Sequence, residues 1–226
     1  MTHVLDRPVW SALSTRQAAL AEGGSRARRY PSAICPFAAA CDDHRESLQA
    51  LEELASSNES LLLIQADDIV VPAGLVTVST AFGVQMIAER PLAKVTDERI
   101  ERLSDADAAD MLALATLTKP GPFSLKAQSL GEFWGVKAKG VLVAMAGERM
   151  KQVGFTELSG VCAHPDFRGN GLGRSLSLFV AGRIIARGEA PYLHAYAANS
   201  VAIALYESIG FKLRRRMNVA LVQRRA

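Results

Sequence analysis

The chain carries the stretch Arg168-Gly169-Asn170-Gly171-Leu172-Gly173 between a short apolar strand pattern, 157–163, and an amphipathic helix pattern, 174–187. Glycine at alternate positions lets the backbone approach a ligand and turn several N–H groups the same way. The amino end of a helix adds partial positive charge, and Arg168 adds a full one. The stretch therefore predicts a loop that holds phosphate at the start of a helix.

Two well-known phosphate-binding motifs do not match this loop. A dinucleotide fingerprint places its third glycine where this chain has Arg174, and it wants an acidic residue at the end of the next strand, which the sequence lacks. A P-loop requires a lysine before serine or threonine, and residues 169–175 offer neither that lysine nor that spacing. Glycine spacing alone leaves an ordinary tight turn at a helix start as an equal alternative.

The patterns on both sides of the loop predict an α/β fold. Ser104, followed by Asp107 three residues later, is typical of a helix start. The elements expected after that helix are strands at 131–137, 140–146 and 153–163, a helix at 174–187, a strand at 192–196, a helix capped by Asn199, and a final hairpin of 212–216 with 218–222. This order predicts a mixed, mostly antiparallel sheet with flanking helices, in which 157–163 and 192–196 form one parallel pair.

The first part of the chain, 1–95, is expected to be an amino-terminal α/β extension of a domain that spans 96–226. Asp43 and Glu46 resemble a capping box for a helix, and a strand pattern follows at 60–65. This part carries no recognisable chemical motif. Three roles are open for it: it covers a substrate site, it forms a homodimer, or it is a decayed second copy of the domain.

Composition excludes several classes of protein. The 226 residues are 49% hydrophobic, which is enough to bury a core, and the net charge of +3 is too small to predict nucleic-acid binding. The longest apolar run, 61–71, is interrupted by Asp67 and Asp68 and is too short to span a bilayer. The first residues, 1–7, lack the apolar centre of a signal peptide. We therefore expect a cytoplasmic protein that binds neither nucleic acid nor membrane.

The three cysteines favour a reducing compartment, because they cannot all pair. Cys35, Cys41 and His44 have an irregular C-x5-C-x2-H spacing with no second pair of ligands, so we expect no metal site. Cys162 lies inside an apolar strand pattern and is expected to be a small core residue rather than a nucleophile.

Two separate places in the chain resemble the GNAT superfamily of acyl-CoA-dependent N-acyltransferases. Arg168, Gly171 and Gly173 match that family's loop pattern, [RQ]-x-x-G-x-[GA], directly after Val161-Cys162-Ala163-His164-Pro165. The second place is Leu205-Tyr206-Glu207-Ser208-Ile209-Gly210-Phe211. The resemblance covers about 104–222, and it implies the fold predicted above.

The resemblance implies acetyl-CoA as the co-substrate and no metal. In the family, the N–H groups of the loop bind the pyrophosphate of coenzyme A, and the preceding strand pairs with the pantetheine arm. Gly160 is well placed for a bulge that would separate this strand from its neighbour. Asn199 resembles a family position that touches the cofactor, while a plain helix cap explains it equally well. The residues implied in cofactor binding are Val161, Cys162, Ala163, Arg168, Gly169, Asn170, Gly171, Leu172, Gly173, Arg174, Asn199 and Tyr206.

The implied reaction moves an acyl group, most often acetyl, from coenzyme A to a primary amine of a small molecule or peptide. By resemblance, Tyr206 is the general acid near the sulfur; a core tyrosine bonded to the backbone is the alternative. By resemblance, Glu157 is the candidate general base, because it precedes Arg168 by eleven residues, where some family members carry a strand glutamate that deprotonates the amine directly or through water. A solvated glutamate is an equal interpretation. A non-catalytic acyl-CoA-binding or sensing module is the alternative function.

The acceptor cannot be read from the sequence. In the family, it is set by the segment that corresponds to 118–125, by the strand meander and by the last hairpin, all of which vary freely. Pro120-Gly121-Pro122-Phe123 and Trp134 are expected either beside the acceptor or in the core.

Overall fold

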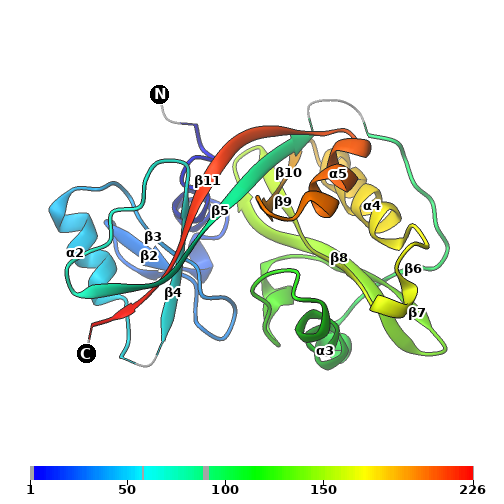
Figure 1. Cartoon of the computed structure of the whole chain (residues 1–226), viewed down its shortest axis with the longest axis horizontal. Coiled ribbons are helices and arrows are strands. Elements are labelled where there is room, and N and C mark those ends of the chain that lie inside the picture. Colours follow the sequence, from blue (N-terminus) through cyan, green and yellow to red (C-terminus); the bar gives the residue numbers. More distant parts are fainter. Residues whose placement is uncertain (1–2, 58, 89–91, 226) are drawn as a thin grey trace.

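The computed structural model describes residues 3–57, 59–88 and 92–225, and its centre is an eight-stranded sheet in the order β4-β11-β5-β10-β9-β8-β7-β6 (Figure 1). Its strands are β4 (Ser60–Gln65), β5 (Leu75–Ala88), β6 (Ile100–Arg102), β7 (Phe133–Ala138), β8 (Val141–Gln152), β9 (Phe155–Ala163), β10 (Ala190–Tyr196) and β11 (Phe211–Arg224). Neighbouring strands are antiparallel except β9 and β10, which are parallel. The prediction of a mixed, mostly antiparallel sheet is therefore confirmed.

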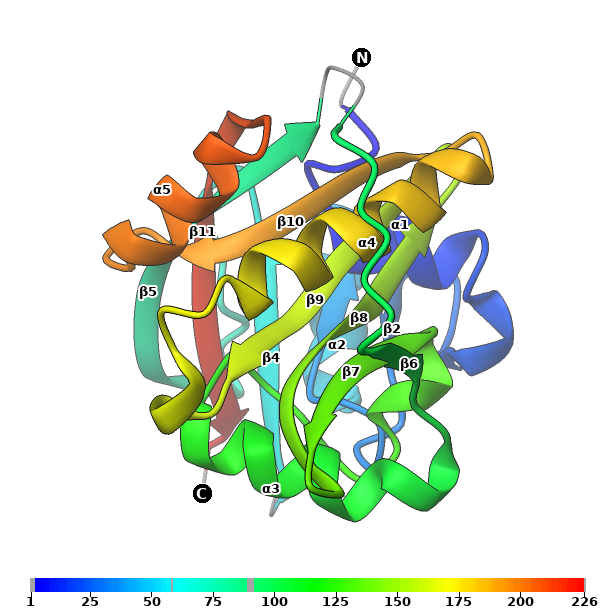
Figure 2. The same cartoon turned by 90° about the vertical axis from the view of Figure 1, so that its right-hand side faces the viewer.

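Helices cover both faces of this sheet. On one face, α4 (Leu172–Ala186) packs across β8, β9 and β10, and α5 (Ser200–Ser208) lies beside it (Figure 2). On the other face lie α1 (Pro8–Ser14) and α3 (Ala108–Thr118). Side chains alternate along β8, so Ala144 packs in the core under α4 while Met145 packs against α3. Of the helices that the structure describes, none is long and apolar enough to cross a membrane.

Several local predictions agree with the structure. Ser104 and Asp107 form a reciprocal capping box ahead of α3. β4 has the predicted bounds. The predicted break between the strands 131–137 and 140–146 is a tight turn between β7 and β8, in which Lys139 and Gly140 have φ 51 and φ 81, in the left-handed region that suits such a turn. These features depend on neighbouring residues alone, which is why the sequence pattern reveals them.

The predicted carboxyl-terminal hairpin is wrong, because β11 runs from Phe211 to Arg224 without a turn. The prediction places the turn at Met217, but this residue is buried and pairs with Gly83 of β5. The register of β11 against β5 shifts instead between Leu213 and Arg215. The long strand β5 pairs with β11 along its whole length, so β11 needs no second arm of a hairpin.

The predicted capping box of Asp43 and Glu46 is also wrong. The helix α2 (Arg45–Glu53) begins after His44, and no described side chain caps it. Both carboxylates pair with arginines instead: Asp43 with Arg7 at 2.5 Å, and Glu46 with Arg26 at 2.7 Å.

The amino-terminal part of the chain joins the large sheet and also makes a small sheet of its own. The small sheet consists of β1 (Glu22–Gly23), β2 (Ala27–Arg29) and β3 (Ala38–Ala40). β4 and β5 both precede residue 95 and lie beside β11 and β10. The division into 1–95 and 96–226 stays a prediction, and the large sheet draws strands from both parts.

The order of elements in the first part repeats in the second. β3, α2, β4 and β5 correspond in order to β9, α4, β10 and β11: a helix joins two parallel segments, and a long strand follows. In the first part, the parallel contact is a single bridge between Phe37 and Leu62. The two long strands are exchanged, since β5 pairs with β10 and β11 pairs with β4 (Figure 1). Among the roles left open for the first part, this topology favours a decayed second copy.

A row of buried and half-buried polar side chains crosses five adjacent strands on the α1 face. This polar row runs from Arg214 on β11 through Gln85, His194 and Glu157 to Arg149 on β8. The fully buried carboxylate of Glu157 accepts hydrogen bonds from Arg149 Nε at 2.8 Å, Arg149 Nη2 at 2.6 Å and His194 Nδ1 at 2.7 Å. A buried carboxylate without such partners would strongly destabilise the fold, so the sheet needs these contacts in order to enclose Glu157.

The polar row predicts a specific loss of stability in acid. The guanidinium of Arg149 and the hydrogen bond from His194 outweigh burial and lower the pKa of Glu157 to about 2. Its stabilising contribution is complete above the ordinary glutamate pKa of about 4.5 and is lost as the pH falls toward 2. The free energy of unfolding should fall by up to about 3 kcal/mol over this range because of this one group. Denaturant unfolding at a series of pH values measures the loss.

Glu157→Gln should remove this part of the acid dependence, whereas Glu53→Gln on the exposed side of α2 should retain it. An equal acid slope in the wild type and in Glu157→Gln would contradict the assignment. If Glu157→Gln does not fold, NMR titration of the wild-type Glu157 carboxyl decides the matter, and a midpoint near 4.5 would count against the ion pair.

Candidate active site

β9 and β10 pair as parallel strands over only three residues each, Phe155–Glu157 with Ala190–Tyr192. Past this point the two strands have no pairing with each other in the part of the chain that the structure describes, although β9 continues to Ala163 and β10 to Tyr196. The strands therefore fork after Glu157. The backbone groups of β9 that face the fork are left without a strand partner, and they are available to a ligand.

A bulge in β9 lies at this fork, as the sequence predicts. Three steps along β9, from Ser159 to Cys162, match only two steps along β8. Gly160 sits in the bulge with φ +65, and a Cβ there would come within 2.9 Å of the Phe133 ring. Both the backbone conformation and the contact require glycine at this position.

A large cleft of about 660 Å³ opens between β9, the start of α4 and α5. All the residues predicted to bind the cofactor line this cleft except Asn170, whose side-chain amide donates to the carbonyl of Phe167 at 3.1 Å. Thr118 at the end of α3, together with Lys119 and Pro120 after it, lines the cleft on the other side.

The glycine loop has the geometry of an anion site. Gly169 and Gly171 have φ 80 and φ 74, and no atom lies within 4 Å of a Cβ built at either position. Gly171 precedes α4, and no side chain among the described residues caps the first turn of this helix. The N–H groups at the start of α4 are therefore open to a ligand, and the helix dipole favours a negative one. The exposed Arg168 and Arg174 border the same space, so the loop fits a diphosphate.

Tyr206 of α5 lies in the wall of the large cleft and is 8% exposed. Its ring packs edge-on against Phe211, and its hydroxyl has no hydrogen-bond partner among the described residues. The structure therefore does not show the alternative, a core tyrosine whose hydroxyl is hydrogen-bonded to the backbone. Burial raises the pKa of Tyr206 to about 12, so the phenol keeps its proton at neutral pH.

Asn199 serves as a cap and also borders the cleft. Its side-chain oxygen accepts a hydrogen bond from the N–H of Ala202 at 3.1 Å at the start of α5. Cys162 also borders the cleft, and burial raises its pKa to about 11, which keeps it a thiol rather than a nucleophilic thiolate. Among the described residues, no three His, Cys, Asp or Glu side chains come together as metal ligands.

Glu157 does not lie where a general base that takes a proton directly from the amine would have to lie. It is fully buried, so it is not a solvated glutamate, and it lines neither the large cleft nor the smaller cavity described next. The ion pair with Arg149 lowers its pKa to about 2, which makes it a weak base. The structure thus argues against direct proton transfer from an amine to Glu157.

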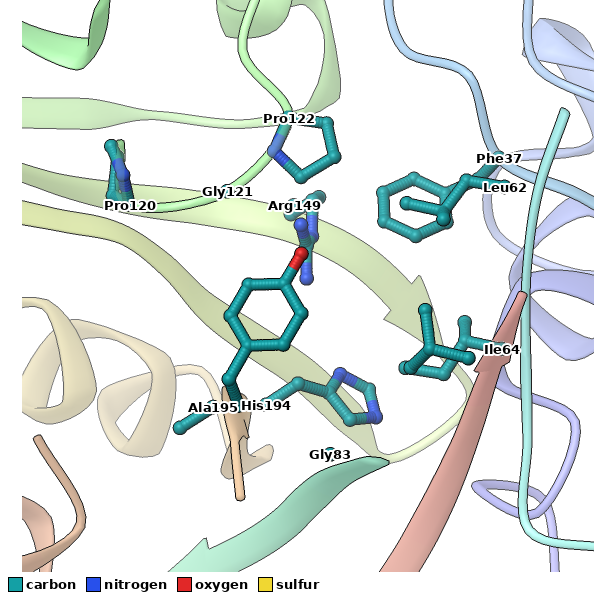
Figure 3. Close-up of a pocket in the computed structure, with 12 residues that line it drawn as sticks. Phe37, Leu62, Ile64, Gly83, Pro120, Gly121, Pro122, Arg149, His194 and Ala195 are labelled. Carbon is teal, nitrogen blue, oxygen red and sulfur yellow. The ribbon is translucent and has the colours of Figure 1, made fainter. Parts of the chain in front are cut away.

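A smaller cavity of about 70 Å³ lies on the opposite side of the fork (Figure 3). The small cavity is lined by Phe37, Leu62, Ile64, Gly83, Pro120, Gly121, Pro122, Arg149, His194, Ala195, Tyr196 and Val219. Pro120 borders both spaces, so the large cleft and the small cavity both lie against the loop that follows α3. The amino-terminal part supplies one wall of the small cavity and therefore covers this side of the fork.

Two functional candidates that the sequence patterns do not single out, Arg149 and His194, reach into the small cavity from β8 and β10 (Figure 3). A signal was present, because each is a charged or polar residue within or just after a strongly apolar strand pattern, where it needs a partner. That partner, Glu157, belongs to a third strand, and only the fold shows it. Trp134, by contrast, lines neither space and packs against Phe179 and Arg183.

Comparison with known proteins identifies the family. The family model of FR47-like proteins matches residues 134–219. A solved structure from Novosphingobium aromaticivorans, described as an acetyltransferase of the GNAT family, shares 39% identity and a TM-score of 0.94, with 100% of both chains covered. No curated protein matches the chain.

More distant structures share the fold alone. A GCN5-related N-acetyltransferase from Kribbella flavida has a TM-score of 0.67 at 16% identity, over 100% of this chain and 98% of that chain. A GCN5-related N-acetyltransferase-like protein from Streptococcus suis has a TM-score of 0.61 at 14% identity, over 98% and 95%. Membership of this family accounts for the fork between β9 and β10 and for the glycine loop. On the evidence of the full-length relative at 39% identity, the chain belongs to the GNAT family of acetyltransferases.

Proposed function

We propose that the protein is an acetyl-CoA-dependent N-acetyltransferase that acts on a primary amine of a small molecule or peptide. The observation that carries this proposal is the pair of spaces on the two sides of the fork, both of which are bordered by Pro120. The large cleft has an anion site and a volume of about 660 Å³, which is room for an extended carrier, and the small cavity gives room for part of a second substrate. Such an arrangement brings two substrates together at one point.

The large cleft would hold coenzyme A. The N–H groups from Gly169 to Arg174 and the side chain of Arg168 would bind the diphosphate, and the free edge of β9 past Glu157 would pair with the amide-bearing arm. Acetyl-CoA supplies the activated acetyl group as a thioester. The unpaired N–H groups of β9 are the donors available for the negative charge that develops on the carbonyl oxygen during attack.

Tyr206 would donate its proton as a hydrogen bond to the departing sulfur. A phenol with a pKa of about 12 is a weaker acid than a thiol, so the hydrogen bond stabilises the thiolate while solvent completes its protonation. We propose that water accepts the proton that the attacking amine loses. Glu157 is enclosed, and His194 Nε2 already accepts a hydrogen bond from Gln85 at 2.9 Å, so neither is free to act as the base.

The proposal predicts acetyl-CoA-dependent thiol release in the presence of a suitable amine, and its dependence on the loop can be tested with two matched glycines. Gly171→Val should raise the KM for acetyl-CoA roughly tenfold or more, because a β-branched residue is strained at φ 74 and would fill the anion site. Gly188→Val introduces similar strain at φ 78 beyond the other end of α4 and should leave that KM unchanged.

Equal effects of the two substitutions on KM would contradict the anion site. Binding of acetyl-CoA in a calorimeter without thiol release over a broad panel of amines would identify a non-catalytic binding module. The absence of any acetyl-CoA binding would reject the proposed function altogether.

Tyr206→Phe should lower kcat by roughly 10- to 1000-fold with little change in KM, because it removes only the hydroxyl that meets the sulfur. The ring contact with Phe211 is retained, so the melting temperature should stay close to that of the wild type. Steady-state kinetics measures the effect. An unchanged kcat would remove Tyr206 from this role.

A further inference from the structure

The lining of the small cavity carries information about the acceptor. Most of its side chains are apolar: Phe37, Leu62, Ile64, Pro122 and Val219 surround the space, and Arg149 is the one lining residue with a permanent charge. The volume of about 70 Å³ holds roughly five water-sized groups. This is enough room for a short branched aliphatic group.

Arg149 presents one unused donor to this space. Its Nε and Nη2 both bond to Glu157, while Nη1 has no hydrogen-bond partner among the described residues. Nη1 lies 4.0 Å from the position of a Cβ built on Gly121, in the loop that borders both spaces. The guanidinium carbon is 4.8 Å from the centre of the Phe37 ring, a cation–π contact that fixes the group in place (Figure 3). The Nη1 group is thus a fixed hydrogen-bond donor beside the loop that borders both spaces.

The charges at the floor of the small cavity cancel. Glu157 balances Arg149. The amide of Gln85 is oriented by Arg214, which donates to its oxygen, and by the carbonyl of Leu5, which accepts from its nitrogen. The Gln85 nitrogen therefore donates to His194 Nε2, which leaves the single ring proton of His194 on Nδ1 for Glu157. At the other end of the polar row, Arg214 pairs with Asp6 at 2.6 Å, so the row together with Asp6 carries no net charge.

A neutral floor selects against acceptors that bring a second charge. A carboxylate beside Arg149 would add an unbalanced negative charge next to the buried Glu157, and a second ammonium group would add an unbalanced positive one. A carbonyl oxygen accepts from Nη1 without adding a charge. An apolar branch of the same molecule can occupy the space between Phe37, Leu62 and Ile64.

Building on the proposed function, we infer that the acceptor is an amine that carries a short apolar branch and, beside the amine, an uncharged carbonyl oxygen bound by Arg149 Nη1, as in an α-amino amide. Four matched amines test each element of this statement. L-Leucinamide has the branch and the neutral oxygen, L-leucine has a carboxylate, 3-methylbutylamine lacks the oxygen, and glycinamide lacks the branch. A fifth, 1,5-diaminopentane, carries a second ammonium group.

Thiol release with saturating acetyl-CoA gives kcat/KM for each amine, expressed per unprotonated amine because their basicities differ. L-Leucinamide should exceed each of the others by roughly tenfold, the effect of one hydrogen bond to a charged donor or of a few buried methylene groups. A preference for L-leucine or for the diamine, or equal values for L-leucinamide and 3-methylbutylamine, would overturn the inference. No release with L-leucinamide would also overturn it, whereas release with any other primary amine would still support the proposed function.

Substitution of the arginine gives a second, independent readout. Arg149→Lys keeps a cation for Glu157 but loses the Nη1 donor, and it should reduce the preference for L-leucinamide over 3-methylbutylamine roughly tenfold. Arg183→Lys is the matched control, since Arg183 lies 4.6 Å over the Trp134 ring outside both spaces and should leave the preference unchanged. The same preference in Arg149→Lys and the wild type would contradict the role of Nη1. If Arg149→Lys does not fold, the ranking of the amines on the wild type decides alone.

Discussion

The buried carboxylate of Glu157 lies where the parallel pairing of β9 and β10 ends, and much of the molecule is arranged to satisfy it. An enclosed carboxylate needs cations or donors around it, and β8 supplies Arg149 while β10 supplies His194. These side-chain contacts hold β9 and β10 together at the last residues where the two backbones pair. Beyond it, the bulge at Gly160 lets β9 leave its neighbour, and the fork opens.

The fork explains how the two halves of the chain contribute to one site. The second half supplies the glycine loop, the free edge of β9 and Tyr206 along the large cleft. The first half supplies Phe37, Leu62 and Ile64 along the small cavity. Because the long strands β5 and β11 are exchanged between the halves, neither half can move away without breaking the centre of the sheet. Under the proposed function, the first half of the chain is therefore a fixed wall of the acceptor site.

The features that the sequence predicts well are those that neighbouring residues determine. The left-handed glycines of the loop, the Ser104–Asp107 capping box and the bulge at Gly160 all depend on short segments. The failures involve partners far away in the chain. Asp43, which was expected to cap a helix, forms an ion pair with Arg7 instead. The expected hairpin is a single strand, β11, because it pairs along its length with β5. The small cavity also depends on partners that are distant in the chain. Its arginine, its histidine and its apolar wall come from different strands, and the carboxylate that the arginine and the histidine share becomes visible only in the fold.

The most direct test of this account is a crystal structure of the protein with coenzyme A bound. The account predicts the diphosphate on the N–H groups between Gly169 and Arg174, the arm of the coenzyme in the fork between β9 and β10, and the sulfur beside Tyr206 near Pro120. Coenzyme A bound elsewhere, or β9 and β10 paired along their full length with the arm outside them, would contradict it.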